Sequence, residues 1–395
     1  MNGYRLCGGT LLTETGMERK DLLLRDGKIL GFLPREETVT EDFQEIDCRG
    51  LYVSPGFVDI HQHGGGGRDY MDSDPDTYRV ATEAHLAHGT TSLMPTSLSA
   101  DTAAMLQAVE TYRTAAADPA VRCNLLGLHM EGPYISPKQA GAQKPEHIRA
   151  FDEGEYRAIL EAAEGSIRRW SVAPEVPGAE KFANIATEKG VTLSIAHSDA
   201  DLETVERAFR WGFRHITHFY SCMSTITRKG GFRVPGVLEA GYFLEDMDIE
   251  LIADGCHIPK ALLSYAAKFK DHRRIALVTD AMRAAGEDTR ESFLGSREDP
   301  LPVIVEDGVA KLTDRSAFAG SVATADRLVR NMLGAGVCLP EAVEMVTVNP
   351  LRMMHLDVKK GILRPGYDGD VCVFDGDIRV KTVFCGGVLA VNRPE

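Results

Sequence analysis

Five residues of types that commonly bind metal ions lie at or near the ends of apolar, strand-like runs in this sequence. His61 and His63 end GFVDIHQH, Glu131 follows CNLLGLHM, His197 closes TLSIAHS, and His218 lies in HITHFY. Because side chains two positions apart on a strand face the same way, His61 and His63 can chelate one ion. Imidazoles and a carboxylate suit Zn, Fe and similar divalent ions. Each histidine alone could be a core or rim residue, but together they predict a metal centre.

Two further residues could take part in catalysis. Asp280 ends the apolar run RIALVTDA, where a carboxylate can accept a proton from a metal-activated water and return it to a leaving nitrogen. Its alternative role is to cap a following helix. His257 in LIADGCHI could polarise a carbonyl or hold an anion, or make only a structural contact in its loop. We predict both as catalytic and also count Asp280 among the residues of the metal site.

These residues need a scaffold that brings strand ends together. Strand-like runs alternate with segments of helical apolar spacing, which is the pattern of an α/β fold and, at this length, of a (β/α)8 TIM barrel. In that fold the functional groups lie at the C-terminal ends of the strands, where the candidates fall. The predicted strands are 56–63, 91–97, 123–132, 168–175, 192–198, 215–220, 249–255 and 274–281, and the predicted helices are 76–89, 104–117, 155–165, 179–190, 201–212 and 259–270.

The two ends of the chain have a different character. Residues 21–34 predict a β-hairpin with Asp26 and Gly27 in its turn, and residues 361–392 contain strands and turns without a helical period. Two β segments at opposite ends of a chain indicate one discontinuous domain. We therefore predict a small β domain from residues 1–53 plus 358–395 and a barrel domain from 54–357.

Composition limits the possible partners and the compartment. The chain has 395 residues, of which 44% are hydrophobic and 26% charged, as in globular proteins. The net charge of -14 argues against nucleic acid and anionic membranes as partners, because like charges repel. The eight cysteines form no CxxC pair, and no apolar run has the length of a signal peptide or a membrane span. We expect a cytoplasmic protein with reduced thiols.

The motifs, in their order and spacing, resemble the N-acetylglucosamine-6-phosphate deacetylases of the amidohydrolase superfamily. The resemblance covers nearly the whole chain, through PGFVDIHQHG, GLHMEGPYISPKQAGAQ, SVAPE, AHSDA, THFYSCM, IADGCH, LVTDAM, FAGS and GDVCVFD. It implies a (β/α)8 barrel with a small β-sandwich built from both termini. It also implies removal of the acetyl group from N-acetylglucosamine 6-phosphate, a step of amino-sugar catabolism that releases acetate and glucosamine 6-phosphate.

The resemblance assigns the metal ligands by position. Glu131, His197 and His218 would bind the principal metal, and His61 and His63 a second metal that only some members hold. Because this pair is intact, one or two divalent ions per subunit are expected. Zn is the first candidate, and Fe, Mn and Co accept the same ligands.

The resemblance also implies the roles of the remaining site residues. Asp280 would act as general base and then as general acid, and His257 would orient the substrate carbonyl. In the family an arginine reaches the phosphate in the neighbouring active site, which implies a homodimer. The implied contacts with the phosphorylated amino sugar are Ala142, Gln143, Ser221, Cys222, Arg233, Phe318, Ala319 and Gly320.

Three departures from the family pattern affect substrate recognition. Gln143 stands where a histidine is common, and Ser221-Cys222 stands where Asn-Ala is common. The segment before Arg233 is longer than usual, so Arg228 competes with it for the phosphate. An alternative substrate is therefore N-acetylgalactosamine 6-phosphate or another acylated amino-sugar phosphate.

Two more distant alternatives remain. A ring-opening amidase of the dihydroorotase or allantoinase kind would bridge two metals with a modified lysine, whereas Glu131 ends the corresponding strand here. A non-catalytic, barrel-shaped scaffold protein should have lost metal ligands or the acid/base residue, and this chain retains all of them.

Overall fold

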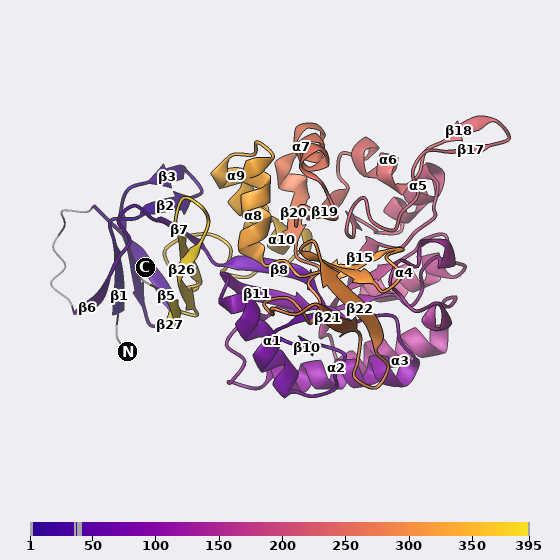
Figure 1. Ribbon diagram of the computed structural model, residues 1–395, viewed down its shortest axis with the longest axis horizontal. Coiled ribbons are helices and arrows are strands. Elements are labelled where there is room, and N and C mark those ends of the chain that lie inside the picture. The colour runs from indigo at the N-terminus through magenta and orange to yellow at the C-terminus, as the bar shows by residue number, and fades with distance from the viewer. Residues whose placement is uncertain (1–2, 35–36, 38–41, 394–395) are drawn as a thin grey trace.

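The computed structural model describes residues 3–34, 37 and 42–393, and its larger part is a curled sheet of parallel strands (Figure 1). A strand is present at each of the eight predicted positions. The strands form two sheets with the orders β12–β11–β8 and β13–β14–β15–β16–β19–β20. Their bounds are β8 Phe57–Gln62, β11 Thr90–Pro95, β12 Asn124–Leu125, β13 Leu128–Glu131, β14 Ile167–Val172, β15 Thr192–Ile195, β16 His215–Ile216, β19 Asp248–Ile252 and β20 Ile275–Val278.

The two parallel sheets are joined at two places. An isolated parallel bridge joins Thr96 to His129, and the backbone N–H of Asp280 donates to the carbonyl of His61 at 2.9 Å. The strands therefore curl into a TIM-like α/β domain. This arrangement gathers the C-terminal ends of the strands at one rim, where the candidate residues were predicted.

Helices cover the outside of the curled sheet, and all six predicted helices are present. Asp101, Asp152 and Asp201 cap α2, α3 and α5 by accepting the backbone N–H three residues further on. None of the helices in the described ranges has the length and apolarity to cross a membrane. The bounds are α1 Asp76–Leu86, α2 Thr102–Ala116, α3 Glu153–Ala163, α4 Ala179–Glu188, α5 Leu202–Arg210, α6 Val237–Phe243, α7 Lys260–Phe269, α8 Ala325–Gly334, α9 Leu339–Glu344 and α10 Val348–Met353.

Both ends of the chain build a separate β region, seen at the left of Figure 1. One sheet has the order β5–β4–β1–β6 and the other β27–β26–β25–β7–β2–β3. The predicted hairpin is β4–β5, and its turn residues Asp26 and Gly27 have φ of 50° and 79°, as a two-residue turn requires. The bounds are β1 Gly3–Cys7, β2 Thr10–Thr13, β3 Gly16–Glu18, β4 Asp21–Arg25, β5 Lys28–Leu33, β6 Phe43–Asp47, β7 Tyr52–Pro55, β25 Val371–Phe374, β26 Val380–Cys385 and β27 Val388–Asn392.

A shared hydrophobic cluster lies between these two sheets. It contains Leu6, Leu22, Leu24 and Ile29 from the first sheet and Leu11, Val53, Val371, Val373 and Phe384 from the second. Because residues from both termini fill one core, the terminal segments stabilise each other.

Three short β insertions were not predicted from the sequence. An antiparallel sheet, β21 Glu291–Leu294, β22 Leu301–Glu306, β23 Val309–Leu312 and β24 Phe318–Ser321, follows β20. A hairpin, β17 Thr227–Lys229 and β18 Phe232–Val234, projects beyond α5 and α6 (Figure 1). A third hairpin, β9 Gly64–Gly65 and β10 Arg68–Asp69, directly follows β8.

A buried carboxylate connects the barrel to the β region. Asp326, at the start of α8, accepts hydrogen bonds from Thr324 Oγ1 at 2.6 Å and Arg330 Nη1 at 2.8 Å, and lies 3.3 Å from His88 Nδ1. Arg330 Nη1 also donates to the carbonyl of Ile378 at 2.8 Å. Burial opposes ionisation, but these partners outweigh it and lower the pKa of Asp326 to about 2.

Replacing this carboxylate should destabilise the protein in a pH-dependent way. Asp326→Asn is expected to lower the free energy of unfolding at pH 7 by about 2 kcal/mol. Since the folded pKa is depressed, the contribution is present above about pH 4 and is lost as the pH falls towards 2. Denaturant unfolding at pH 7 and pH 3 measures it, with the exposed Asp377→Asn as control. An equal difference at both pH values would contradict the assignment.

Candidate metal centre and substrate cavity

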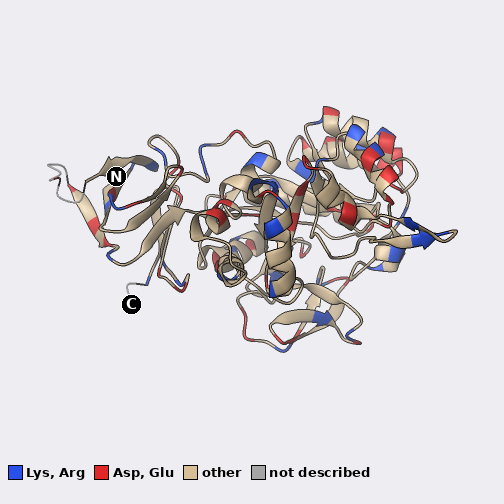
Figure 2. Ribbon diagram, turned by 90° about the horizontal axis from the view of Figure 1, so that it is seen from above, with Lys and Arg blue, Asp and Glu red and all other residues tan. Residues whose placement is uncertain are grey.

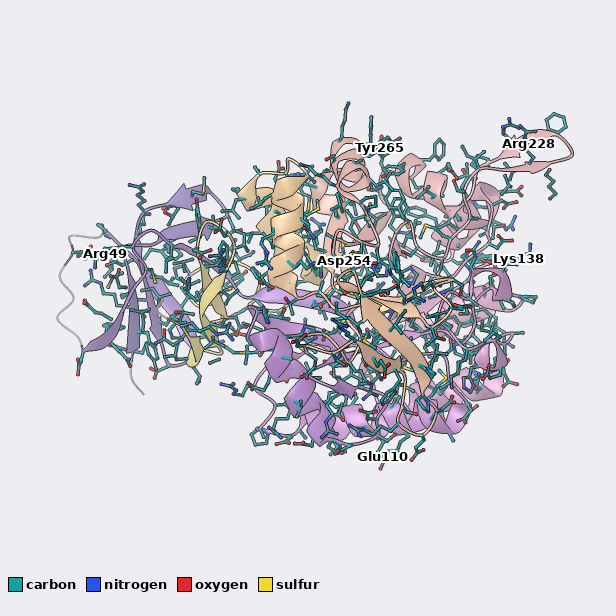
Figure 3. All side chains as sticks on the ribbon, viewed as in Figure 1. Arg49, Glu110, Lys138, Arg228, Asp254 and Tyr265 are labelled. Carbon is teal, nitrogen blue, oxygen red and sulfur yellow. The ribbon has the colours of Figure 1, made fainter. Side chains whose placement is uncertain are left out.

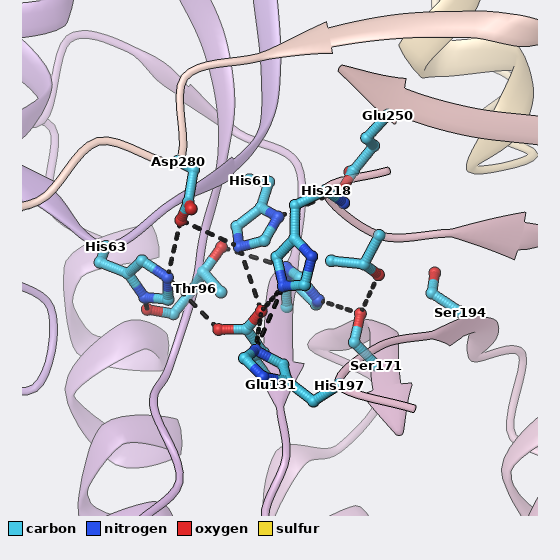
Figure 4. Close-up of polar contacts among 12 residues, drawn as sticks. His61, His63, Thr96, Glu131, Ser171, Ser194, His197, His218, Glu250 and Asp280 are labelled. Carbon is cyan, nitrogen blue, oxygen red and sulfur yellow. Dashed lines mark hydrogen bonds and ion pairs between the residues drawn. The ribbon is translucent and has the colours of Figure 1, made fainter. Parts of the chain in front are cut away.

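The predicted metal-binding residues come together at one rim of the curled sheet. Two clusters within the described residues could each hold an ion, His61 with His63 and Asp280, and Glu131 with His197 and His218. All six side chains are buried. They lie in or within two residues of the ends of β8, β13, β15, β16 and β20, and Figure 4 shows them pointing toward one another.

The backbone at three of these positions is unusual. His197, His218 and Asp280 have φ of 45°, 30° and 48°, in the left-handed region that non-glycine residues rarely adopt. Each follows its strand by two residues, so the turn redirects the side chain into the site. Such strain at strand ends is frequent where function requires a fixed side-chain position.

Glu131 contacts both clusters. Its Oε1 lies 3.1 Å from His218 Nε2 and 3.5 Å from Nε2 of both His197 and His61. Its Oε2 lies 3.4 Å from His63 Nε2. One carboxylate therefore contacts histidines of both clusters, as expected of a ligand shared between two ions.

Asp280 completes the cluster on the side of β8. Its Oδ1 lies 3.1 Å from His63 Nε2 and 3.4 Å from His61 Nε2. The side chain also lines the cavity described below, so it is accessible from the open end of the site. Asp280 is thus placed between the candidate ligands and the space where a substrate would bind.

The electrostatics of the centre fit a bound cation. Burial disfavours the ionised carboxylate, but the nearby imidazoles of His61, His197 and His218 outweigh it and hold the pKa of Glu131 well below its usual range. Likewise, burial lowers the pKa of His63, but Asp280 and Glu131 raise it to about 10. A divalent ion supplies the same positive charge in place of these protons.

An unpartnered ring nitrogen supports the same conclusion. His61 Nε2 is buried and makes no hydrogen bond within the described part of the chain, although two carboxylates lie near it. A buried polar atom without a partner is costly. A metal ion coordinated by the nitrogen and the carboxylates would remove that cost, so the residues fit a divalent metal.

The outer ring nitrogens of three histidines are held by further contacts. His61 Nδ1 lies 3.2 Å from Glu250 Oε2, His63 Nδ1 lies 3.3 Å from the carbonyl of Thr96, and His197 Nδ1 lies 2.7 Å from the carbonyl of Gln139. Contacts of this kind orient metal-binding imidazoles. These partners could not be predicted from the sequence, because two of them are backbone carbonyls and nothing local marks Glu250 on β19 as a partner of His61.

His129 shows how a similar histidine is excluded. It faces the same way as Glu131 on β13, but Thr96 Oγ1 lies 3.1 Å from its Nδ1 and Ser171 Oγ lies 2.6 Å from its Nε2. With both nitrogens engaged, His129 belongs to the hydrogen-bond network below the centre and has none left for a metal.

A cavity of about 230 Å³ opens directly onto the metal centre. His257 lines it, and Asp254 Oδ2 lies 2.8 Å from His257 Nδ1, which leaves Nε2 for a substrate. The ring of His257 packs on Phe318 with centroids 4.7 Å apart. The β21–β24 insertion therefore supplies part of the cavity wall through β24. The family resemblance implied contacts at Phe318 and Gly320, but the antiparallel sheet that carries them was not predicted.

Most of the predicted substrate residues reach the cavity, namely Ala142, Gln143, Ser221, Cys222, Phe318 and Gly320. Ala319 does not, because its side chain is fully buried in a hydrophobic cluster with Met282 and Leu294. Neither Arg228 nor Arg233 lines this cavity, since both lie on the projecting β17–β18 hairpin. Figure 3 shows Arg228 at that outer end.

Gln143 has a second contact that was not predicted. Its Nε2 donates to Glu131 Oε2 at 3.0 Å, and its Oε1 accepts the backbone N–H of Ser99 at 2.9 Å. Gln143 therefore contacts the shared carboxylate of the metal centre as well as the cavity.

Comparison with known proteins gives consistent matches. The sequence profile of the amidohydrolase family matches residues 52–390. The chain is 31% identical to an N-acetylgalactosamine-6-phosphate deacetylase from Escherichia coli O157:H7, covering 96% of this chain and 97% of the relative. It is also 31% identical to the N-acetylglucosamine-6-phosphate deacetylase from Bos taurus, covering 97% and 93%.

Solved structures agree with this result. The N-acetylglucosamine-6-phosphate deacetylase from Pasteurella multocida has a TM-score of 0.91 at 28% identity and covers 99% of this chain and 100% of its own. A variant of the Mycobacterium smegmatis deacetylase in complex with N-acetyl-D-glucosamine-6-phosphate has a TM-score of 0.90 at 28% identity, with coverage of 99% and 100%.

Proposed function

The chain belongs to the amidohydrolase family, and from that premise we propose that it hydrolyses the acetamide of N-acetylglucosamine 6-phosphate to glucosamine 6-phosphate and acetate. The observation that supports this most directly is the juxtaposition of two candidate ligand clusters with Asp280 at the wall of one cavity. Relatives that align with nearly the whole of this chain are named for this activity.

Glu131, His197 and His218 would hold the principal divalent ion, and His61, His63 and Asp280 a second one. Zn is the first candidate, and Fe, Mn and Co have the same ligand preferences. A divalent ion held by these residues would activate a water for attack at neutral pH and polarise the amide carbonyl.

The residues of the chain would then move protons and hold the substrate. Asp280 accepts the proton of the attacking water and returns it to the sugar nitrogen as the C–N bond breaks. His257, held through Nδ1 by Asp254, also lines the cavity and orients the carbonyl. A general base that becomes a general acid must lie beside both the attacking water and the leaving nitrogen, and the position of Asp280 between the candidate ligands and the cavity supports this role.

For the phosphate we propose Arg233, acting on the active site of a second copy of the chain. Arg228 and Arg233 are directly opposite each other in the β17–β18 hairpin, and both are exposed. Like charges opposite each other on two strands repel, so a bound anion would stabilise this hairpin. Figure 2 shows the hairpin, with its basic residues in blue, projecting at the end of the molecule far from the β region, where a neighbouring subunit could be reached.

Substituting these arginines should separate their roles. Arg233→Ala is expected to raise KM for the phosphorylated sugar about 10–100-fold, because a hydrogen bond to a charged group contributes roughly 1.5–3 kcal/mol. The same variant should leave KM for unphosphorylated N-acetylglucosamine unchanged. Steady-state kinetics of Arg233→Ala beside Arg228→Ala decide which residue binds the phosphate. If both variants keep the wild-type KM, the phosphate is bound elsewhere.

The galacto epimer is a second candidate substrate. Gln143 and Ser221-Cys222, which depart from the common pattern, line the cavity, and one relative is an N-acetylgalactosamine-6-phosphate deacetylase. Acetate release from both phosphorylated epimers and from unphosphorylated N-acetylglucosamine tests the proposal, with metal content determined on the same sample. Preference for the galacto epimer keeps the chemistry and changes the substrate, whereas no release from metal-loaded protein would refute the deacetylase function.

The domain organisation and location form part of the same proposal. We infer a closed (β/α)8 barrel over residues 54–357 and a β-sandwich from residues 1–53 and 358–395. The shared cluster between the two terminal sheets supports the sandwich. All eight cysteines are free, which fits the cytoplasmic location expected from the sequence.

A further inference from the structure

A fully buried ion pair lies beneath the metal centre. Arg169 on β14 and Glu250 on β19 are both 0% exposed, and Arg169 Nη1 forms an ion pair with Glu250 Oε1. Neither residue lines the cavity, so neither can contact a substrate there. Burying two charges is costly and an unpaired one costs more, so the pair requires an explanation beyond stability.

The guanidinium of Arg169 is fixed by several strands. Its Nε donates to Ser194 Oγ at 2.9 Å, and its Nη1 donates to the carbonyl of Ile60 at 3.2 Å. Its Nη2 donates to Thr217 Oγ1 at 2.8 Å and lies 3.1 Å from His215 Nδ1. These contacts leave the group no freedom to turn, and its charge keeps the facing carboxylate ionised.

The second oxygen of Glu250 points into the metal centre. Oε2 lies 3.2 Å from His61 Nδ1 and accepts the backbone N–H of His218 at 3.1 Å (Figure 4). An ionised carboxylate can only accept hydrogen bonds, so Nδ1 of His61 must carry the hydrogen. With that hydrogen on Nδ1, the lone pair available to a cation is the one on Nε2, which faces Glu131 and Asp280.

We propose that Glu250, locked by Arg169, is the positioning residue that fixes His61 in the tautomer able to bind a cation, and thereby sets the affinity of the His61–His63–Asp280 position. This inference rests on the metal centre of the proposed function. The role of Glu250 does not extend to the rings of His63 and His197, because backbone carbonyls orient those two ligands.

Glu250→Gln tests this with nearly unchanged volume. A glutamine that keeps its oxygen toward Arg169 presents its amide N–H₂ to His61 Nδ1, which then has to accept and moves the hydrogen to Nε2. Affinity for the second Zn²⁺ is expected to fall about 10–100-fold. The first Zn²⁺ should weaken less, because Glu250 meets that site only through the backbone N–H of His218. Zn²⁺ titration against a competing chelator, with elemental analysis, gives both values.

The tautomer itself can be observed without any metal. In metal-free protein with ¹⁵N-labelled histidine, at a pH high enough for the ring to be neutral, NMR correlation of ring nitrogens and protons should show the hydrogen of His61 on Nδ1 in the wild type and on Nε2 in Glu250→Gln. Ser194→Ala is the matched control, because it removes one contact of Arg169 without touching His61. It should change neither the tautomer nor the affinity for Zn²⁺.

Several outcomes would overturn the inference. A wild-type His61 with its hydrogen on Nε2 would do so without any variant, even if Glu250→Gln failed to fold. The inference would also be overturned if Glu250→Gln bound the second Zn²⁺ as tightly as the wild type does. It would likewise be overturned if Ser194→Ala lost as much affinity for the second Zn²⁺ as Glu250→Gln. The expected tautomers in a protein that releases no acetate from either sugar phosphate would support the role of Glu250 and refute only the proposed substrate.

Discussion

Asp280→Asn is expected to lower the rate of acetate release from N-acetylglucosamine 6-phosphate by about 10²–10⁴-fold, the usual contribution of a general acid or base. An amide has nearly the same shape as the carboxylate but can neither accept the proton of the attacking water nor return one to the leaving nitrogen. The variant should therefore lose kcat with little change in KM. A discontinuous assay of acetate at saturating substrate measures the loss.

Metal content and stability distinguish this loss from a damaged site. Glu131, His197 and His218 do not depend on Asp280, so the principal metal should stay bound in Asp280→Asn. The second metal is expected to weaken, since Oδ1 lies only 3.1 Å from His63 Nε2, but the amide oxygen can still coordinate. An Asn variant with more than about a tenth of the wild-type rate would refute the proton-transfer role, because general acid–base catalysis contributes about 10²-fold or more.

The strands and the metal-site residues could be predicted from the sequence for one shared physical reason. A strand such as Thr192–Ile195 is an apolar run, and the polar residue that closes it, here His197, is costly to bury unless it has a partner. Parallel strands bring such residues to one rim, so polar residues that follow apolar runs in the sequence lie close together in the fold. The hairpin turn at Asp26 and Gly27 was predictable because its chemistry is local.

The layer below the metal centre could not be predicted in the same way. Arg168 and Arg169 are adjacent in β14, and only the second is buried. Nothing local in IRRWSV distinguishes them, because the partner that stabilises a buried guanidinium, Glu250, lies on another strand. The bond from Gln143 to Glu131 has the same origin, since a loop residue meets a strand end only in the folded chain.

The β21–β24 sheet that forms part of the cavity wall was not predicted for a related reason. Residues 291–321 contain short β strands with many charged residues and glycines, and their inner face packs on the barrel through Leu294 and Ala319. Such strands are half-buried and short, so their apolar pattern is weak. The position of Arg233 likewise depends on the β17–β18 hairpin, whose strands of three residues each are too short to give a clear apolar pattern.

Glu131→Gln is expected to abolish activity by removing both metal positions at once, whereas His63→Asn should remove only the second. The carboxylate of Glu131 faces His197 and His218 with one oxygen and His63 with the other, so a neutral amide weakens both clusters. Its N–H₂ group would also face either the amide of Gln143 or the imidazoles. Because metal binding supplies the nucleophile, we expect a loss greater than about 10³-fold. Elemental analysis of both variants, with acetate release in excess Zn²⁺, measures the effect. A Glu131→Gln protein that retains the same metal content as His63→Asn would show that the two clusters do not share this ligand.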